Sequence, residues 1–258
     1  MKLILILLTI SSTFSHAKTS ITWIGQAATL IQTVEGKKIL IDPFIFNNPK
    51  TPKALKDEKL YKDIDLILIT HGHGDHLGDY KKILSLSPKS KIIMNADMGN
   101  VLISEKQFSK ERFHPLNKSG EVSPLGKAVK VIMVRAEHSS SVKINEKVHY
   151  GGEPVGYVLE FSDGKKLYHA GDTGVFQDMK LIGDYYKIDL ALVPIGGNYT
   201  MGPKEAAFAI NNLLKPKKVI PIHYGTFPIL TGTPEEFKKE LKDKTPLLIL
   251  GPGDETKL

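Results

Sequence analysis

Cysteine is absent from this chain of 258 residues. Its absence excludes disulfide bonds, thiolate nucleophiles, cysteine-type zinc sites and iron–sulfur clusters. A bound metal ion would therefore need histidine and carboxylate ligands, and the chain contains 9 histidines with 28 Asp and Glu residues. The histidines are consequently the first residues to place.

Long runs of basic residues are also absent. Lys and Arg number 35, and the formal net charge is +7, but no run of five or more basic residues occurs. This charge favours an anionic small-molecule substrate, whereas the scattered basic pairs argue against nucleic acid as a partner. The hydrophobic content of 41% and charged content of 24% exclude disorder, collagen and a coiled coil for the whole chain.

The first 17 residues have the pattern of an export signal. Lys2 precedes an apolar stretch over residues 3–10, and a polar segment then ends in Ser15-His16-Ala17, with small residues at the cleavage positions. The apolar stretch is far shorter than the roughly 20 residues of a membrane-spanning helix, so no stable membrane anchor is expected. A buried first strand is the alternative. We expect a signal peptide that is cleaved after Ala17, and hence a periplasmic or secreted protein.

Residues 18–258 alternate between strand and helix patterns without a linker, which predicts one layered α/β domain. Two hairpins are expected, each with a turn that contains glycine, over residues 29–41 and 156–168. Other expected strands cover residues 66–69, 91–94, 129–134, 190–193 and 218–222. Helices are expected over residues 76–86 with Asp75 as N-cap, over 204–214, and from the capping box at Thr233–Glu236 to Leu241.

The strongest chemical signal is the segment His71-Gly72-His73-Gly74-Asp75-His76, directly after an apolar strand. Four potential ligands within six positions suit a divalent cation, because imidazole nitrogen and carboxylate oxygen are typical zinc ligands. The two glycines would let the backbone turn tightly enough to aim several side chains at one point. A polar surface loop is the alternative interpretation, and the spacing argues against it.

Three more candidates follow other expected strands, namely His138, Asp172 and His223. Sites in α/β sheets gather at the carboxyl ends of strands, so these side chains are expected to meet the histidine segment. Five histidines and two aspartates are too many for one tetrahedral ion and suit a pair of ions. His169 lies in a strand nearby and could support a ligand from behind.

These residues resemble the metallo-β-lactamase superfamily in the H-x-H-x-D-H pattern of residues 71–76, His138, Gly171-Asp172-Thr173 and His223. The segments 151–156, 196–203 and 222–228 resemble its bacterial metal-dependent hydrolase branch, which is related to L-ascorbate-6-phosphate lactonase. The resemblance covers essentially residues 19–250. It implies a four-layer αββα sandwich with a dinuclear site at one edge.

The resemblance also implies a ligand set. His71, His73 and His138 would hold the first metal; Asp75, His76 and His223 would hold the second; Asp172 would bridge them. Class B1 β-lactamases carry a cysteine ligand that this chain lacks, which argues against antibiotic hydrolysis. The diiron oxidoreductases of the superfamily have glutamate where this chain has His73, so hydrolysis is favoured.

The expected function is metal-dependent hydrolysis of an ester, a lactone or a phosphoester by a hydroxide shared between two divalent metal ions. Zinc is the first candidate, and manganese, iron and nickel accept the same ligands. Asp75 and Asp172 could transfer protons, and Asn198 and Tyr224 are candidate donors to the developing oxyanion. The alternatives are a non-catalytic metal-binding or partner-binding protein on this fold and a nuclease of the superfamily. The sequence does not determine the oligomeric state.

Overall fold

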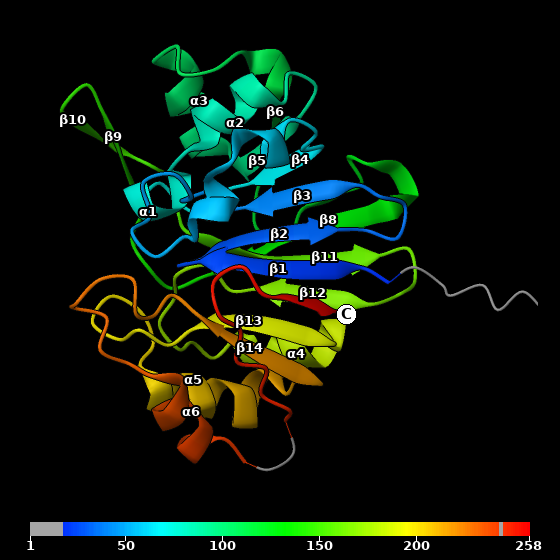
Figure 1. Cartoon of the computed structure of the whole chain (residues 1–258), viewed down its shortest axis with the longest axis vertical. Coiled ribbons are helices and arrows are strands. Elements are labelled where there is room, and N and C mark those ends of the chain that lie inside the picture. Colours follow the sequence, from blue (N-terminus) through cyan, green and yellow to red (C-terminus); the bar gives the residue numbers. More distant parts are fainter. Residues whose placement is uncertain (1–17, 243–244) are drawn as a thin grey trace, which may run out of the picture.

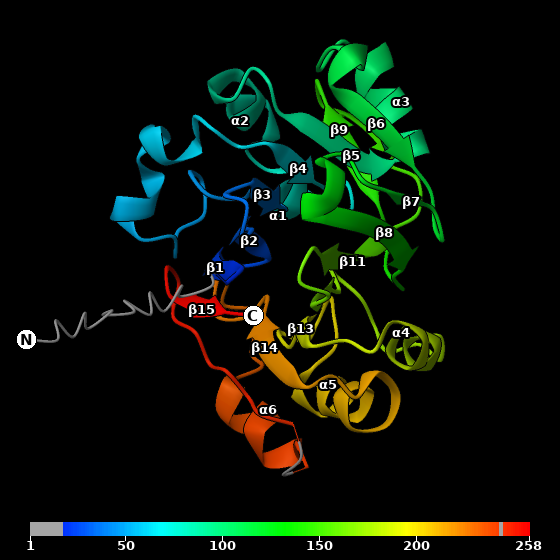
Figure 2. The same ribbon diagram turned by 90° about the vertical axis from the view of Figure 1, so that its right-hand side faces the viewer.

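The computed structural model describes residues 18–242 and 245–258, so the expected signal peptide lies outside the described residues. Two large sheets face each other (Figures 1 and 2). The first sheet has the strand order β15 (Glu255–Lys257), β1 (Ser20–Gly25), β2 (Ala28–Gln32), β3 (Lys38–Ile41), β4 (Leu66–Leu68), β5 (Lys91–Asn95) and β6 (Phe113–Leu116). The second has the order β14 (Lys218–Ile222), β13 (Leu190–Pro194), β12 (Lys166–His169), β11 (Val155–Phe161), β8 (Val129–Arg135) and β7 (Glu121–Val122).

Helices cover the outer face of each sheet. The first sheet carries α1 (Gly74–Leu77), α2 (Tyr80–Leu86) and α3 (Ala96–Ser104); the second carries α4 (Met179–Tyr186), α5 (Pro203–Phe208) and α6 (Pro234–Glu240). A separate hairpin of β9 (Ser141–Ile144) and β10 (Lys147–Tyr150) projects from the molecule (Figure 1). Short 3-10 turns occupy Lys53–Lys56, Glu58–Tyr61, Lys110–Arg112 and Gly126–Ala128. The predicted αββα sandwich is thus confirmed.

Three apolar clusters separate the four layers. Side chains such as Ile41 and Leu192 meet between the two sheets, because alternate residues of each strand point to opposite faces. Tyr168 packs with the helices outside the second sheet, and Ile67 with those outside the first. Burying three apolar layers supplies the main driving force for folding in a chain without disulfides.

Strand direction places the polar corners of the fold together. In the first sheet β1 and β3 run parallel to β4; in the second, β8 runs parallel to β12, β13 and β14. The loops at the carboxyl ends of these strands therefore gather at one edge of the sandwich, as parallel strands require. This edge carries all the candidate ligands.

The predicted helix over residues 76–86 was wrong as one element. The chain forms α1 and α2 instead, because Gly78 adopts a φ of 43° that breaks the helix. Asp75 does not cap α1; His73 occupies the N-cap position, and Asp75 lies in the first turn. This places Asp75 on the helix, where its carboxylate faces the strand edge.

The other two predicted helices are confirmed. Thr233 and Glu236 form the reciprocal capping box of α6, and α5 begins with Pro203 at its first position. The second half of the predicted 204–214 helix winds as a π-helix over Ala209–Leu214. None of the described helices has the length and apolarity needed to cross a bilayer.

Candidate metal centre

The loop after β4 and the first turn of α1 carry the histidine segment. Gly72 lies so close to the neighbouring loop that a Cβ would be 2.6 Å from the carbonyl oxygen of Ser141. Only glycine allows this approach, and the Gly72 N–H donates to Ser140 Oγ at 3.2 Å. Gly74, in contrast, has open space around its Cβ position and begins α1. Of the two glycines, only Gly72 is required by tight packing.

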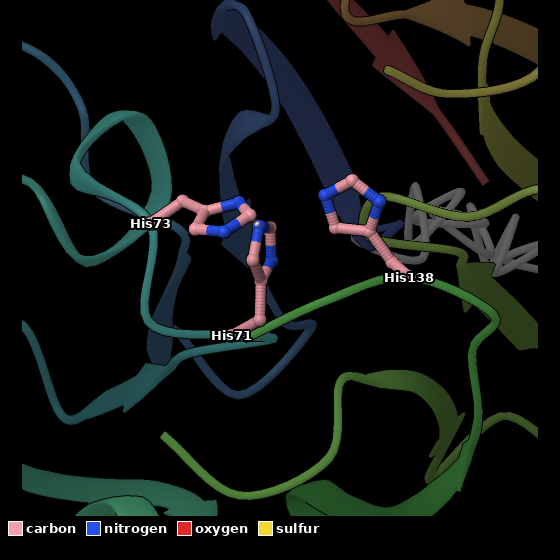
Figure 3. A group of neighbouring side chains, drawn as sticks. All are labelled: His71, His73 and His138. Atoms are coloured by element: carbon pink, nitrogen blue, oxygen red, sulfur yellow. Dashed lines mark hydrogen bonds between the residues drawn. The ribbon is translucent and has the colours of Figure 1, made fainter. Parts of the chain in front are cut away.

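The first group of candidate ligands consists of His71, His73 and His138, whose nitrogen atoms lie within 4.8 Å of one another. His71 Nε2 and His73 Nδ1 are 3.0 Å apart. Figure 3 shows the rings of these three residues converging from two loops. His138 arrives on the loop after β8, which the Ser140 contact fastens to the loop of Gly72.

The second group consists of Asp75, His76 and His223, also with ligand atoms within 4.8 Å of one another. Asp75 Oδ2 lies 3.7 Å from His76 Nε2 and 3.4 Å from His223 Nε2. Ligand atoms around a tetrahedral zinc ion are roughly 3.3 to 3.6 Å apart, so these spacings fit one cation.

Asp172 lies between the two groups. Its Oδ2 atom is 3.0 Å from His223 Nε2 and 3.2 Å from His76 Nε2. The same atom is 3.7 Å from His138 Nε2 and 4.0 Å from His71 Nε2. One buried carboxylate oxygen thus faces imidazole nitrogens of both groups, which is the geometry of a bridging ligand.

Several polar atoms in this cluster have no hydrogen-bond partner among the described residues. They are Nε2 of His76, Nε2 of His138, Nδ1 of His223 and Oδ1 of Asp172. A buried polar atom without a partner costs about 1–3 kcal/mol. Cation binding would satisfy the Nε2 atoms, so the donor set fits divalent metal ions.

Burial lowers the pKa of His71, His73 and His138. Positive charge on neighbouring histidines, such as His76, lowers it further. These three rings are therefore neutral at neutral pH and keep a lone pair for a cation.

The second group behaves differently because it contains more carboxylate. Burial disfavours a charged ring at His76 and His223, but Asp172 and Asp75 outweigh that effect and raise the pKa of both histidines, that of His223 to about 9. The same imidazoles hold the pKa of both carboxyl groups below the ordinary value despite burial. Cation binding at this group must therefore displace protons.

Asp42 orients one histidine of each group, and the sequence analysis did not include it in the site. Its Oδ2 lies 2.8 Å from His76 Nδ1 and accepts a 2.7 Å hydrogen bond from Thr70 Oγ1. Thr70 Oγ1 in turn lies 3.0 Å from His71 Nδ1. These contacts leave the Nε2 atoms of both rings facing the centre. Its position at the end of β3 was the available signal.

Gln26 is a second residue of the site that no sequence pattern indicates. It follows β1, is fully buried, and donates from Nε2 to Asp75 Oδ2 at 2.8 Å. The same nitrogen is 2.7 Å from His223 Nε2, and the Gln26 Oε1 atom has no partner among the described residues. The His223 backbone N–H also donates to the Gln26 carbonyl at 2.9 Å. No motif marks this glutamine; only its place after a strand does.

Other predicted residues lie outside this cluster. Asn198 is exposed in a turn with a φ of 58° and does not line the central cavity among the described residues. Tyr224 stacks on Trp23 at 5.2 Å, and its hydroxyl faces the Leu250 carbonyl at 3.4 Å, away from the ligands. His169 contacts the Ala27 carbonyl at 3.0 Å and no candidate ligand side chain in the described part of the chain. The structure therefore does not bring Asn198 or Tyr224 to the ligand cluster.

A cavity of about 810 Å³ opens beside the ligands. This volume lies within the usual range for small-molecule sites. Its lining combines five candidate ligands with polar and apolar neighbours: Gln26, Phe44, His73, Gly74, Asp75, His138, Ser139, Asp172, Tyr199, His223, Phe227, Ile229 and Leu230. The ligand cluster is thus accessible to a small molecule from one side.

Comparison with known proteins identifies close relatives. A family described as "Beta-lactamase superfamily domain" matches residues 37–224. A UPF0173 metal-dependent hydrolase of Cupriavidus metallidurans is 47% identical over 257 residues, covering 95% of this chain and 88% of the relative. A second, of Thermodesulfovibrio yellowstonii, is 41% identical and covers 99% of this chain and 97% of the relative.

Solved structures share the architecture. The metallo hydrolase Igni18 from the archaeon Ignicoccus hospitalis is similar to this chain with a TM-score of 0.80 and 32% identity. The match covers 94% of this chain and 99% of the archaeal one. A zinc-dependent hydrolase of the metallo-β-lactamase superfamily from Thermotoga maritima, with 24% identity and a TM-score of 0.51, matches 90% of this chain and supports the fold.

Proposed function

This chain belongs to the UPF0173 metal-dependent hydrolases of the metallo-β-lactamase superfamily, and we propose that it hydrolyses an ester, a lactone or a phosphoester with two divalent cations. His71, His73 and His138 would hold one cation, and the group around His76 would hold the other. Zinc suits the nitrogen-rich donors best, and manganese, iron and nickel accept the same ligands. The cations would supply Lewis acidity and lower the pKa of water from about 16 toward 7.

One observation carries the dinuclear proposal. Asp172 Oδ2 lies 3.0–4.0 Å from imidazole nitrogens of both ligand groups, and its side chain is only 4% exposed. A buried carboxylate needs opposing positive charge. Asp172 would help to hold both cations, which would supply that charge once the protons of the neighbouring imidazoles have left.

The remaining residues of the centre hold its shape and move protons. Asp75 is 27% exposed and lines the cavity, so its carboxylate can exchange a proton with the leaving group. Gln26, which also lines the cavity, holds that carboxylate in place with a 2.8 Å hydrogen bond. Asp42 fixes the ring orientation of His76 at 2.8 Å.

The dinuclear proposal is tested by metal analysis of the parent protein and of the variant Asp172→Asn. Protein dialysed against zinc should retain two equivalents per chain, and Asp172→Asn should retain fewer. Hydrolysis of 4-nitrophenyl acetate or bis(4-nitrophenyl) phosphate should be sensitive to chelators and fall at least a thousandfold in the variant. Asp178→Asn, at an exposed residue paired with Arg135, is the matched control. A stoichiometry of one, or full activity of Asp172→Asn, would refute the dinuclear proposal.

We also propose that the protein is exported and acts in the periplasm or outside the cell. The charged, apolar and small-residue order of residues 1–17 supports this. Cell fractionation followed by N-terminal sequencing should find a mature chain that starts at Lys18. An intact N-terminus in the cytoplasmic fraction would contradict export.

A further inference from the structure

The cavity beside the metal centre has no lysine or arginine in its lining, among the residues that the structure describes. The chain nevertheless carries 35 such residues and a net charge of +7. The ionisable side chains of the lining, apart from the Tyr199 phenol, are all candidate metal ligands: His73, Asp75, His138, Asp172 and His223. The basic surface therefore does not continue into the cavity.

An apolar wall takes the place of cationic side chains. Phe44 and Phe227 stack with ring centroids 6.2 Å apart, and Leu230 lies beside them in the lining. Ile229 and Tyr199 complete the rim, and they remain 48% and 59% exposed. Large apolar side chains that stay exposed at the mouth of a site commonly mark a surface for an apolar ligand.

The same loops that carry the centre also carry this wall. Phe44 follows Asp42 by two residues, and its N–H donates to the Asp42 carbonyl at 2.7 Å. Phe227 follows His223 by four residues, and its carbonyl accepts from the Leu230 N–H at 3.0 Å. The wall is thus fixed relative to the reacting groups, as a specificity pocket requires.

On the basis of the proposed function, we infer that the substrate is a neutral carboxylic ester or lactone whose aromatic or aliphatic group packs against Phe44, Phe227 and Ile229. An anionic group packed against this wall would lose its hydrating water without gaining a cationic partner. In the reaction the water oxygen bonds to the acyl carbon, the bond from that carbon to the alkoxy oxygen breaks, and the alkoxy oxygen takes a proton from the water. This inference replaces the anionic substrate that the net charge suggested.

The test compares two esters that differ only in terminal charge. 4-Nitrophenyl hexanoate and the 4-nitrophenyl monoester of adipic acid have the same leaving group and six-carbon acyl chain. With the zinc-loaded protein, kcat/KM should be at least about tenfold higher for the hexanoate, because its methyl end contacts the apolar wall. 4-Nitrophenyl acetate, which is too short to reach the wall, serves as the reference for basal hydrolysis.

Two variants relate the preference to named residues. Phe227→Ala should raise KM for the hexanoate about tenfold and lower the hexanoate-to-acetate ratio of kcat/KM by a similar factor. Ile229→Lys places a cation at the exposed rim and should shift the hexanoate-to-adipate ratio at least tenfold toward adipate. Phe208→Lys, at a 53% exposed residue of α5 outside the cavity lining, should leave the ratio unchanged.

The outcomes separate this inference from the proposed function. Chelator-sensitive acetate hydrolysis with a hexanoate-to-adipate ratio of one or less would overturn the apolar substrate and leave the hydrolase intact. If none of the esters is hydrolysed, calorimetry with hexanohydroxamate and the monohydroxamate of adipic acid still measures the preference of the zinc-loaded protein. The inference is supported if the neutral hydroxamate binds more tightly than the charged one and if this preference is weaker in Ile229→Lys. Equal binding of the two hydroxamates overturns it.

Discussion

Substitution of Gln26 is the sharpest test of whether the two ligand groups bind their cations separately. The buried amide nitrogen of Gln26 donates to Asp75 Oδ2 at 2.8 Å and lies 2.7 Å from His223 Nε2, and among the described residues it has no hydrogen bond to a ligand of the first group. A hydrogen bond to a charged group contributes about 1.5–3 kcal/mol, and each 1.4 kcal/mol corresponds to a factor of ten. Gln26→Leu, which keeps most of the side-chain volume, should therefore weaken the second cation roughly ten- to hundredfold.

The assay is a zinc titration in competition with a chromophoric chelator, which resolves the two equivalents. Only one of the two zinc equivalents should change in Gln26→Leu, and the thermal midpoint of the metal-free protein should shift little. Gln32→Leu, at the exposed end of β2, is the matched control. Equal weakening of both equivalents, or of neither, would show that Gln26 does not act through the ligands of the second group.

Three further predictions use the surrounding contacts. Asp42→Asn should weaken both zinc equivalents about 10- to 100-fold in the same titration, because Asp42 contacts His76 directly and His71 through Thr70. Burial lowers the pKa of His169, so the unfolded chain binds a proton first as the pH falls below about 6.5, and stability drops by up to about 1.4 kcal/mol per pH unit. Urea unfolding of metal-free His169→Gln from pH 8 to 5 should show a shallower slope than the parent, and an unchanged slope would exclude this role. Removing zinc from protein in which both sites are saturated at 100 times Kd should lower the melting temperature by about 10–20 °C, measured by calorimetry, with no change expected if the centre binds no metal.

The position of the ligands could be predicted because each follows the end of a strand. His71, His138, Asp172 and His223 come after β4, β8, β12 and β14, and parallel strands end at the same edge of their sheets. The sequence therefore predicted which edge of the sheets carries the ligands, but it gave no distances between them. It could not show that one oxygen of Asp172 faces both groups, since that depends on how the two sheets pack.

Residues that support the ligands were harder to predict. Asp42 and Gln26 also follow strands, but a single aspartate or glutamine after a strand is more often a turn residue. The substrate wall was equally hidden, because Phe44 and Phe227 lie 183 positions apart and meet only through the fold. Net charge is a weak guide to the substrate for a related reason: it sums over the whole surface, whereas the neutral substrate that we infer rests on the lining of one cavity.

Backbone strain connects the stability of the fold to the centre. Gln26, Asp42 and His223 are non-glycine residues with φ values of 53°, 46° and 57°. Such conformations cost on the order of 1–3 kcal/mol each and persist only where surrounding contacts fix them. The contacts that fix them here are those of the centre: the Gln26 carbonyl accepts from the His223 N–H, and Asp42 accepts from Thr70. Because the strained residues are a candidate ligand and two residues that contact ligands, relieving the strain by substitution would stabilise the loops and displace the side chains that hold the metal.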